Sequence, residues 1–174
     1  MLTPQLDIYT HLGPKVKGMQ VLEVGFGTGL GTLQLVARAH HVTAIELDSE
    51  AVAFAARVLP KQARWFQADI LTAQYASQFN AVVMIEVLEH IRDYRRALEN
   101  IRLALRPGGV LYMSARNAHA DLRRNELHER EWTAAQLTEA LSEYFSEVNL
   151  WDYTLTEKQT TETRMTPLVA EARK

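Results

Sequence analysis

The stretch VLEVGFGTG, from Val21 to Gly29, decides how the rest of the chain is interpreted. An aliphatic run that carries one acid ends in three glycines at alternate positions, Gly25, Gly27 and Gly29. Because glycine has no side chain, a turn of this kind lets a ligand approach the backbone closely. The stretch therefore predicts a buried strand, a glycine turn and a helix, with a ligand site at the turn.

Short apolar runs alternate with helical patterns on both sides of this turn. Strands are expected at residues 19–25, 41–47, 63–69, 80–87 and 109–115, and helices at 30–38, from a cap at Asp48 or Ser49 to Pro60, and from a cap at Asp93 to Leu105. Continuous apolar strands joined by helices predict a parallel sheet that helices cover on both faces. The segment Arg106-Pro-Gly-Gly109 is expected to end the third helix and turn the chain into the fifth strand.

The C-terminal part of the chain follows a different pattern. Thr133 and Gln136 have the spacing of a capping box, which predicts a helix that runs to Tyr144. Two more strands, 146–155 and 165–174, are separated only by a polar connector, so we expect them to pair as a hairpin. The otherwise parallel sheet would then include one antiparallel strand. No repeat or linker interrupts the pattern, which favours one domain over residues 1–174.

Composition and charge exclude several classes of protein. The 174 residues are 47% hydrophobic and 23% charged, with a net charge of −2, which is typical of a globular domain and makes no overall electrostatic case for nucleic acid. The absence of cysteine excludes disulfides, thiolate metal sites and a cysteine nucleophile. No apolar run reaches the about 18 residues of a membrane span, and the N-terminus lacks a signal-peptide core, so we expect a cytoplasmic protein without membrane contacts.

The spacing of the glycines disfavours a dinucleotide as the ligand. Dinucleotide turns follow Gly-x-Gly-x-x-Gly, whereas the order here is Gly25-x-Gly27-x-Gly29. Glu23 also stands two residues before the first glycine, where a carboxylate would repel a pyrophosphate but would suit a cationic amine. A nicotinamide dehydrogenase is therefore not expected.

Acidic residues also end the next two expected strands. Glu46 ends the second strand, where a carboxylate can accept hydrogen bonds from both hydroxyls of a ribose. Asp69 ends the third strand, where its carboxylate could accept a hydrogen bond from an adenine amino group. A ligand with an adenine, a free ribose and a cationic amino-acid end, but no phosphate, is S-adenosylmethionine.

The order of these motifs resembles that of the class I S-adenosylmethionine-dependent methyltransferases. EVGFGTG, the acid in AIELD, the aspartate in QADI, FNAVVMIEVLEH and LRPGGVLYMS follow one another over residues 19–115 as they do in that family. The resemblance implies an α/β fold, a Rossmann-like doubly wound seven-stranded sheet that is mostly parallel with one antiparallel C-terminal strand. It also implies that a methyl group leaves S-adenosylmethionine by in-line displacement, with S-adenosylhomocysteine as the product.

The resemblance implies roles for individual residues as well. The glycines would border the methionine moiety, Glu23 would support its amino group, and the residues after the fourth strand would line the methyl-transfer side. The expected cofactor-binding residues are Glu23, Gly25, Gly27, Gly29, Glu46, Leu47, Asp69, Ile70, Glu86 and Val87. The structural alternatives are that the glycines form only a tight corner, that Glu46 is a surface acid and that Asp69 caps a turn. Residues 1–18 are expected either to close over the cofactor or to form a plain surface helix.

A second polar group follows the fourth strand. Glu86, Glu89 and His90 belong to the sequence EVLEH, and His128 lies in a long loop, residues 116–132, that should overhang the same end of the sheet. If they converge, two carboxylates and two imidazoles suit magnesium or manganese, which would bind a hydroxyl acceptor and lower its pKa. The pattern resembles two metal-dependent groups, the O-methyltransferases of ubiquinone synthesis and the 2′-O-methyltransferases that act on small RNAs. Without a metal, His90 or His128 could act as a general base, or both could be structural.

These features leave three functions open. The first is transfer of a methyl group to a small-molecule acceptor, at a hydroxyl oxygen. The second is an RNA-directed, metal-dependent 2′-O-methyltransferase, for which Arg116, Arg123, Arg124 and Arg130 in the long loop could bind phosphate, unless they form only a solvated charged loop. The third is a module that binds S-adenosylmethionine without transferring its methyl group. The motifs describe the cofactor half of the site and do not identify the acceptor.

Overall fold

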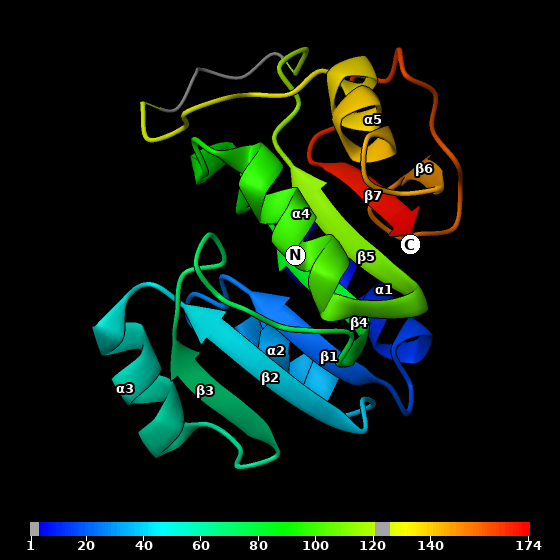
Figure 1. Cartoon of the computed structure of the whole chain (residues 1–174). Coiled ribbons are helices and arrows are strands. Elements are labelled where there is room, and N and C mark those ends of the chain that lie inside the picture. The colour runs from blue at the N-terminus through cyan, green and yellow to red at the C-terminus, as the bar shows by residue number, and fades with distance from the viewer. Residues whose placement is uncertain (1–3, 121–125) are drawn as a thin grey trace.

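The computed structural model of the chain describes residues 4–120 and 126–174 (Figure 1). The strands are β1 (Gln20–Val24), β2 (His41–Glu46), β3 (Ala63–Gln67), β4 (Phe79–Ile85), β5 (Leu105–Ala115), β6 (Glu147–Trp151) and β7 (Leu168–Arg173). The helices are α1 (Pro4–Lys15), α2 (Leu30–Val36), α3 (Ser49–Val58), α4 (Tyr94–Ala104) and α5 (Ala134–Ser142), with a 3-10 turn, η1, at Leu88–His90. Each strand and helix expected from residue 19 onward is present close to its expected bounds.

All seven strands form one sheet with the order β3-β2-β1-β4-β5-β7-β6. Strands β1 to β5 are parallel, and β7 is antiparallel to both of its neighbours, β5 and β6. The predicted α/β fold is therefore confirmed, a Rossmann-like and mostly parallel sheet with an antiparallel strand near the C-terminus. The strand order reverses between β1 and β4, and open sheets of this type bind ligands at such a point, beyond the carboxyl ends of the strands.

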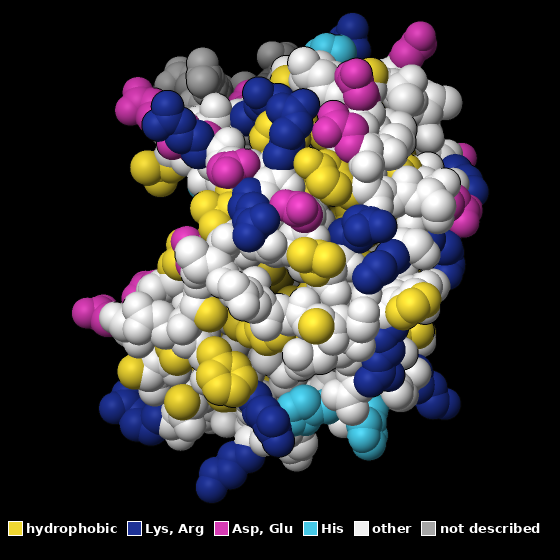
Figure 2. All heavy atoms as spheres, in the orientation of Figure 1, with side chains coloured by type: hydrophobic (Ala, Val, Ile, Leu, Met, Phe, Trp, Pro, Cys, Tyr) yellow, Lys and Arg dark blue, Asp and Glu magenta, His cyan; other side chains and the backbone are white. Residues whose placement is uncertain are grey.

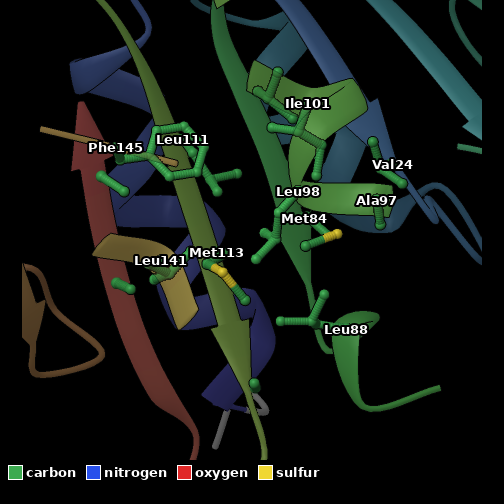
Figure 3. Packing of buried hydrophobic residues seen from close by; sticks show 14 of the residues in the cluster. Val24, Met84, Leu88, Ala97, Leu98, Ile101, Leu111, Met113, Leu141 and Phe145 are labelled. Atoms are coloured by element: carbon green, nitrogen blue, oxygen red, sulfur yellow. The ribbon is translucent and has the colours of Figure 1, made fainter. Parts of the chain in front are cut away.

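Two hydrophobic layers attach the helices to the two faces of the sheet. One layer includes Ile8 and Leu35 and lies beneath α1, α2 and α3, and the other includes Leu98 and Leu141 and lies beneath α4 and α5. Figure 1 shows α4 and α5 in front of the sheet and α1 and α2 behind it, and Figure 3 shows Leu98 of α4 directed toward Met84 of β4. Full burial of one such side chain contributes about 1.5–3 kcal/mol, so these layers hold the strand ends in place.

Local side-chain signals set the starts of three helices. Asp48 accepts hydrogen bonds from two backbone amides in the first turn of α3, and Asp93 accepts one from the amide of Arg96 in α4. Thr133 and Gln136 form the reciprocal capping box at the start of α5, with both hydrogen bonds at 3.1 Å. These predicted caps are confirmed, and each commonly contributes about 1 kcal/mol to stability.

The segment Arg106-Pro-Gly-Gly109 does not form the separate turn that was expected, because β5 begins directly after α4. Pairing between β4 and β5 shifts register between Phe79 and Ala81, which leaves extra residues on the β5 side. Gly108 has a φ angle of +72°, a conformation that lets these residues bulge while the strand continues. The prediction of a turn is wrong here because a proline and two glycines can also be accommodated in a bulge.

The connection between β3 and β4 has no helix. Residues 68–78, which join β3 to β4, contain turns and irregular backbone only. The face that α4 and α5 cover elsewhere is therefore open over the first halves of β1, β2 and β3, as Figure 1 shows. Within residues 4–120 and 126–174, no helix has the length and apolar character that crossing a membrane requires.

Candidate functional site

The glycine turn between β1 and α2 needs its glycines for different reasons. Gly25 and Gly27 have φ angles of +72° and +53°, a left-handed region that costs other residues about 1–2 kcal/mol. A Cβ atom on Gly25 would lie 2.5 Å from Cγ2 of Val87, whereas a Cβ atom on Gly27 would meet no atom within 4 Å. Gly25 therefore lets the turn pack against the segment after β4, and the backbone of Gly27 stays accessible.

Glu46, at the carboxyl end of β2, faces this turn from the other side. Its carboxylate accepts hydrogen bonds from the backbone amides of Gly27 at 3.0 Å, Leu47 at 2.7 Å and Asp48 at 3.3 Å. The amides orient the carboxylate toward the glycine turn. These backbone amides therefore hold the Glu46 side chain at the carboxyl edge of the sheet, where the sequence predicts ribose recognition.

Asp69 lies in the turn that follows β3. Its Oδ1 accepts a hydrogen bond from the amide of Leu71 at 2.8 Å, so the side chain does cap a turn. The buried Asn100 of α4 donates hydrogen bonds to the carbonyl oxygens of Ile70 and Leu71, at 2.8 and 3.0 Å, and anchors the turn to the helix. Capping and ligand binding are compatible, because a carboxylate has a second oxygen that can accept hydrogen bonds.

These segments surround a cavity with a volume of about 430 Å³. It lies at the carboxyl ends of β1, β2, β3 and β4, and Figure 2 shows the molecule hollowed at this edge. Eight of the ten expected cofactor-binding residues line it, namely Gly25, Gly27, Glu46, Leu47, Asp69, Ile70, Glu86 and Val87. The volume is within the range of about 300–1,000 Å³ that is usual for small-molecule sites.

The other two expected residues, Glu23 and Gly29, do not line the cavity. Glu23 is fully buried in β1, and its Oε1 accepts a hydrogen bond from the hydroxyl of Tyr9 at 2.7 Å. Burial raises the pKa of Glu23 to about 7, although the Thr32 and Tyr9 hydroxyls favour its charged form. The Thr32 hydroxyl is near but completes no hydrogen bond, so Oε2 of Glu23 has no partner among the described residues. Gly29 opens α2, and a Cβ atom there would clash with Leu59, so close packing accounts for this glycine.

Helix α1 packs behind the glycine turn and does not line the cavity. Ile8 and Leu12 belong to the hydrophobic layer beneath α1, α2 and α3, and a Cβ atom on Gly31 of α2 would clash with the ring of Tyr9. The described part of residues 1–18 therefore forms a helix on the back of the sheet. In this position it supports the turn from behind.

Glu86 follows β4 with a φ angle of +56°, a strained conformation for a residue other than glycine. The Ser114 hydroxyl donates a hydrogen bond to Oε1 of Glu86 at 3.0 Å, and the Glu86 amide donates to Oγ of Ser114 at 3.1 Å. Burial raises the pKa of Glu86, and the hydrogen bond from Ser114 opposes this effect. Sequence reasoning missed Ser114, although a hydroxyl near the carboxyl end of an apolar strand is a signal, and it also missed Ile91 and Arg92, which line the cavity directly after EVLEH.

Glu89, His90 and His128 converge beside the cavity. Their ligating atoms all lie within 4.8 Å of one another, and the two imidazole rings meet edge to face with centroids 4.9 Å apart. The amides of Glu129 and Arg130 donate hydrogen bonds to the carbonyl oxygen of Glu89, at 2.9 and 3.2 Å, which attaches the loop to η1. Of the four residues predicted to bind a metal, the fold thus brings three together and leaves Glu86 out of the group.

Glu89 is the member of this group with the most unusual surroundings. Its side chain is buried, and neither carboxylate oxygen completes a hydrogen bond within the described part of the chain. Burial and the neighbouring Glu86 raise the pKa of Glu89 to about 7, against the opposing effect of nearby backbone amides and Arg116. A buried carboxylate without donors is stable only when it is protonated or paired with a cation. A carboxylate and two imidazoles are a donor set that a divalent metal accepts.

The arginines of the long loop are mostly engaged within the protein. Arg116 forms an ion pair with Glu131 at 3.2 Å. The guanidinium group of Arg130 lies over two aromatic rings, at 5.0 Å from each centroid. Arg123 and Arg124 lie outside the described residues. Of the described arginines in this loop, Arg116 is thus paired with an acid and the exposed Arg130 is held over aromatic rings.

Comparison with known proteins relates the chain to a family. The family described as "methyltransferase domain" matches residues 22–113, which run from β1 into β5. An uncharacterized methyltransferase of Mycobacterium tuberculosis (strain ATCC 25618 / H37Rv) is 38% identical over 108 residues, covering 61% of this chain and 53% of that protein. A ubiquinone biosynthesis O-methyltransferase of Aeromonas salmonicida is 30% identical over 118 residues, covering 65% of this chain and 50% of that protein. The chain spans about half the length of the curated relatives it matches.

A solved structure shares the fold over almost the whole chain. The N-methyltransferase NodS of Bradyrhizobium japonicum, in complex with S-adenosylhomocysteine, has a TM-score of 0.69 and covers 98% of this chain, with 84% of NodS covered in turn. The sequences are 23% identical, so this likeness concerns the fold. The family match extends over more than half of the chain and includes the glycine turn, Glu46 and Asp69. The chain therefore belongs to the methyltransferase domain family and has the fold of S-adenosylmethionine-dependent methyltransferases.

Proposed function

We propose that the chain binds S-adenosylmethionine in the cavity at the carboxyl edge of the sheet and transfers its methyl group to a small-molecule acceptor. One observation carries the proposal, namely that the glycine turn, Glu46 and Asp69 come from three strand ends and line one cavity. Among the described residues, three carboxylates line this cavity against one guanidinium group, that of Arg92, which disfavours a pyrophosphate. The lining suits an adenosine that carries a cationic amino acid.

Each part of the lining has a role in this proposal. Glu46 would accept hydrogen bonds from the ribose hydroxyls, Asp69 and Ile70 would flank the adenine, and the glycine turn would leave room for the methionine moiety. Glu86 and Val87 would border the reacting end. S-adenosylmethionine supplies a methyl group on a cationic sulfonium, so the protein mainly has to hold the acceptor in line and in contact.

A hydroxyl oxygen is the acceptor atom that we propose. His90 lines the cavity, and its Nδ1 lies 3.1 Å from the carbonyl oxygen of Leu127. If the N–H group at Nδ1 donates a hydrogen bond to that carbonyl oxygen, Nε2 of the neutral imidazole keeps its lone pair. Nε2 could then take the hydroxyl proton while the methyl–oxygen bond forms and the methyl–sulfur bond breaks. His128, whose ring contacts that of His90, would hold the imidazole in place.

Isothermal titration calorimetry with S-adenosylhomocysteine tests the cofactor assignment first. Saturable binding to the purified chain is expected, and no binding at all would overturn the proposal. The second measurement is transfer of radiolabelled methyl from S-adenosylmethionine to phenols, catechols and an RNA oligonucleotide. Labelling of the small hydroxyl compounds is expected. Labelling of RNA alone would favour the RNA-directed alternative, and binding without any transfer would favour a module that only binds the cofactor.

A metal-assisted version of this reaction has a specific observation in its favour. Glu89 is buried, neither of its carboxylate oxygens completes a hydrogen bond with a described residue, and its carboxylate lies within reach of His90 and His128. These three residues would hold a divalent cation, with manganese favoured over magnesium because imidazole is a poor ligand for magnesium. A cation there would bind the acceptor hydroxyl and favour its deprotonation.

Manganese binding separates the two versions of the mechanism. A chelator-treated chain should bind manganese in a calorimetric titration, and Glu89→Gln and His128→Ala should each weaken that binding more than about tenfold. The matched control is His119→Ala, which removes an exposed histidine of the same loop. Manganese affinity that is equal in His128→Ala and in the unmodified chain would exclude this metal site, and methyl transfer would then depend on His90 alone.

A further inference from the structure

The amino edge of the sheet carries a second cavity, with a volume of about 550 Å³. It lies on the face of β1, β2 and β3 that no helix covers, and it has no lining residue in common with the cavity at the carboxyl edge. We call it the basal basin and define it by five of its lining residues, His41, Arg64, Phe66, Tyr75 and Arg106. These residues come from two strands, the β3–β4 connection and the bulge of β5, so the tertiary fold assembles them.

The charged groups of the basal basin are all basic. Arg64, Arg106 and His41 line it, and none of its described lining residues is acidic. Neither arginine forms an ion pair in the described part of the chain, and both side chains are exposed. Burial and the positive charges of Arg64 and His40 lower the pKa of His41. Figure 2 shows Lys, Arg and His side chains gathered along this lower edge of the molecule.

Aromatic rings give the basal basin an apolar part. Phe66 of β3 is 47% exposed, which is unusual for a phenylalanine in a sheet. Tyr75 packs edge to face against Phe79, with ring centroids 5.3 Å apart. An exposed ring beside guanidinium groups offers a surface on which a planar group can stack.

We propose that the basal basin binds a small phosphate ester with a planar body, such as a nucleoside monophosphate. Two guanidinium groups that form no ion pair within residues 4–120 and 126–174 suit a phosphate, whose oxygens accept several charge-assisted hydrogen bonds. The exposed ring of Phe66 supplies a contact for the planar body. The volume exceeds what a bare ion fills and is within the usual range for small-molecule sites. This site is separate from methyl transfer, because the two cavities lie at opposite edges of the sheet.

Nuclear magnetic resonance of the full chain saturated with S-adenosylhomocysteine tests the proposal, with uridine 5′-monophosphate as the probe. Saturable shifts are expected for backbone amides at His41, Arg64 and Arg106. Arg64→Gln and Arg106→Gln should each weaken binding about tenfold, the effect of losing a charge-assisted contact. The matched control is Arg57→Gln, which removes an exposed arginine of α3 outside the basal basin and should leave the affinity unchanged.

Three outcomes would overturn the proposal. Uridine that binds as tightly as its monophosphate would show that the phosphate is not recognised. Shifts that do not saturate, or that map to the carboxyl edge, would show that the basal basin is not a site for this class of ligand. An oligouridylate that binds while the monophosphate does not would assign the same arginines to an RNA surface instead. The spectra also report whether each variant is folded, so loss of structure cannot be mistaken for loss of binding.

Discussion

The carboxyl and amino edges of this sheet are built from the same strands but differ in charge, burial and backbone. At the carboxyl edge, Glu46 and Glu86 line a cavity beside a left-handed glycine turn, and Glu23 is buried behind that turn. At the amino edge, the exposed Arg64 and Arg106 line a second cavity. One edge thus concentrates negative charge in a low-dielectric setting, and the other presents positive charge to solvent.

The difference matters because the two arrangements have different effects on stability. Glu23 and Glu89 are buried, and burial raises the pKa of each to about 7. A buried acid without enough donors lowers stability, and such groups cluster at functional sites. Exposed arginines on the other edge lower the stability of the fold little, because they stay in contact with water. The carboxyl edge is therefore the more constrained site, and substitutions there should have the larger effects.

The largest effect should come from Gly25→Ala. Gly25 and Gly18 both have a φ angle of +72°, but a Cβ atom on Gly25 would lie 2.5 Å from Val87, and one on Gly18 would meet nothing within 4 Å. Gly25→Ala should lower the free energy of unfolding by about 3–5 kcal/mol and abolish S-adenosylhomocysteine binding, whereas Gly18→Ala should cost about 1–2 kcal/mol. Urea denaturation measures both. Equal losses of unfolding free energy in the two variants would show that the left-handed backbone, and not the contact with Val87, causes the loss.

A pH effect on stability should follow from Glu23, whose pKa rises from 4.5 to about 7 on burial. The folded chain keeps a proton that the unfolded chain releases, so this contribution is complete below pH 4.5 and is lost as the pH rises through 7. The loss is on the order of 3 kcal/mol. Relative to Glu23→Gln, the unmodified chain should become less stable from pH 4.5 to 8 in urea denaturation. A relative gain in stability over this range would contradict the assignment.

Glu46→Gln should have a smaller effect, which a binding measurement reports. Its carboxylate is held by three backbone amides, and loss of one charged partner for the ribose should weaken S-adenosylhomocysteine binding by about 1–3 kcal/mol. The control is Glu50→Gln, a nearby exposed acid in the first turn of α3 that does not line the cavity. Calorimetric titration compares the two. Affinity that Glu46→Gln leaves unchanged would exclude Glu46 from the ribose site.

The smallest effect is expected at the amino edge. Arg106→Gln should change neither the affinity for S-adenosylhomocysteine nor the free energy of unfolding by more than about 0.5 kcal/mol, because the side chain is exposed and forms no ion pair in the described part of the chain. Calorimetric titration with S-adenosylhomocysteine measures the affinity, and urea denaturation measures the free energy of unfolding. A larger loss of cofactor affinity would mean that the two edges of the sheet are coupled.

Some of the site was predictable because its signals are local. Gly25, Gly27 and Glu46 were expected from spacing alone, and the cavity brings them together. Two other contacts had no local signal. Glu23 meets Tyr9 from a helix behind the sheet, and the Ser114 hydroxyl holds Glu86 from the neighbouring strand. Both contacts join segments far apart in the chain, and spacing along a sequence carries no information about such distances.

Hydrophobic periodicity, helix caps and the glycine turn were sufficient to predict the succession of strands and helices along the chain and the place of the glycine turn, because each depends on neighbouring residues. The tertiary structure decided that Glu23 and Glu89 are buried. It also brought His128 to Glu89 and His90. It also decided that the β3–β4 connection leaves a sheet face open and that Arg106 and Arg64 line the same basal basin. Burial and the charges around a group depend on the packing of distant segments, and burial and charge are what set a pKa or create a binding surface.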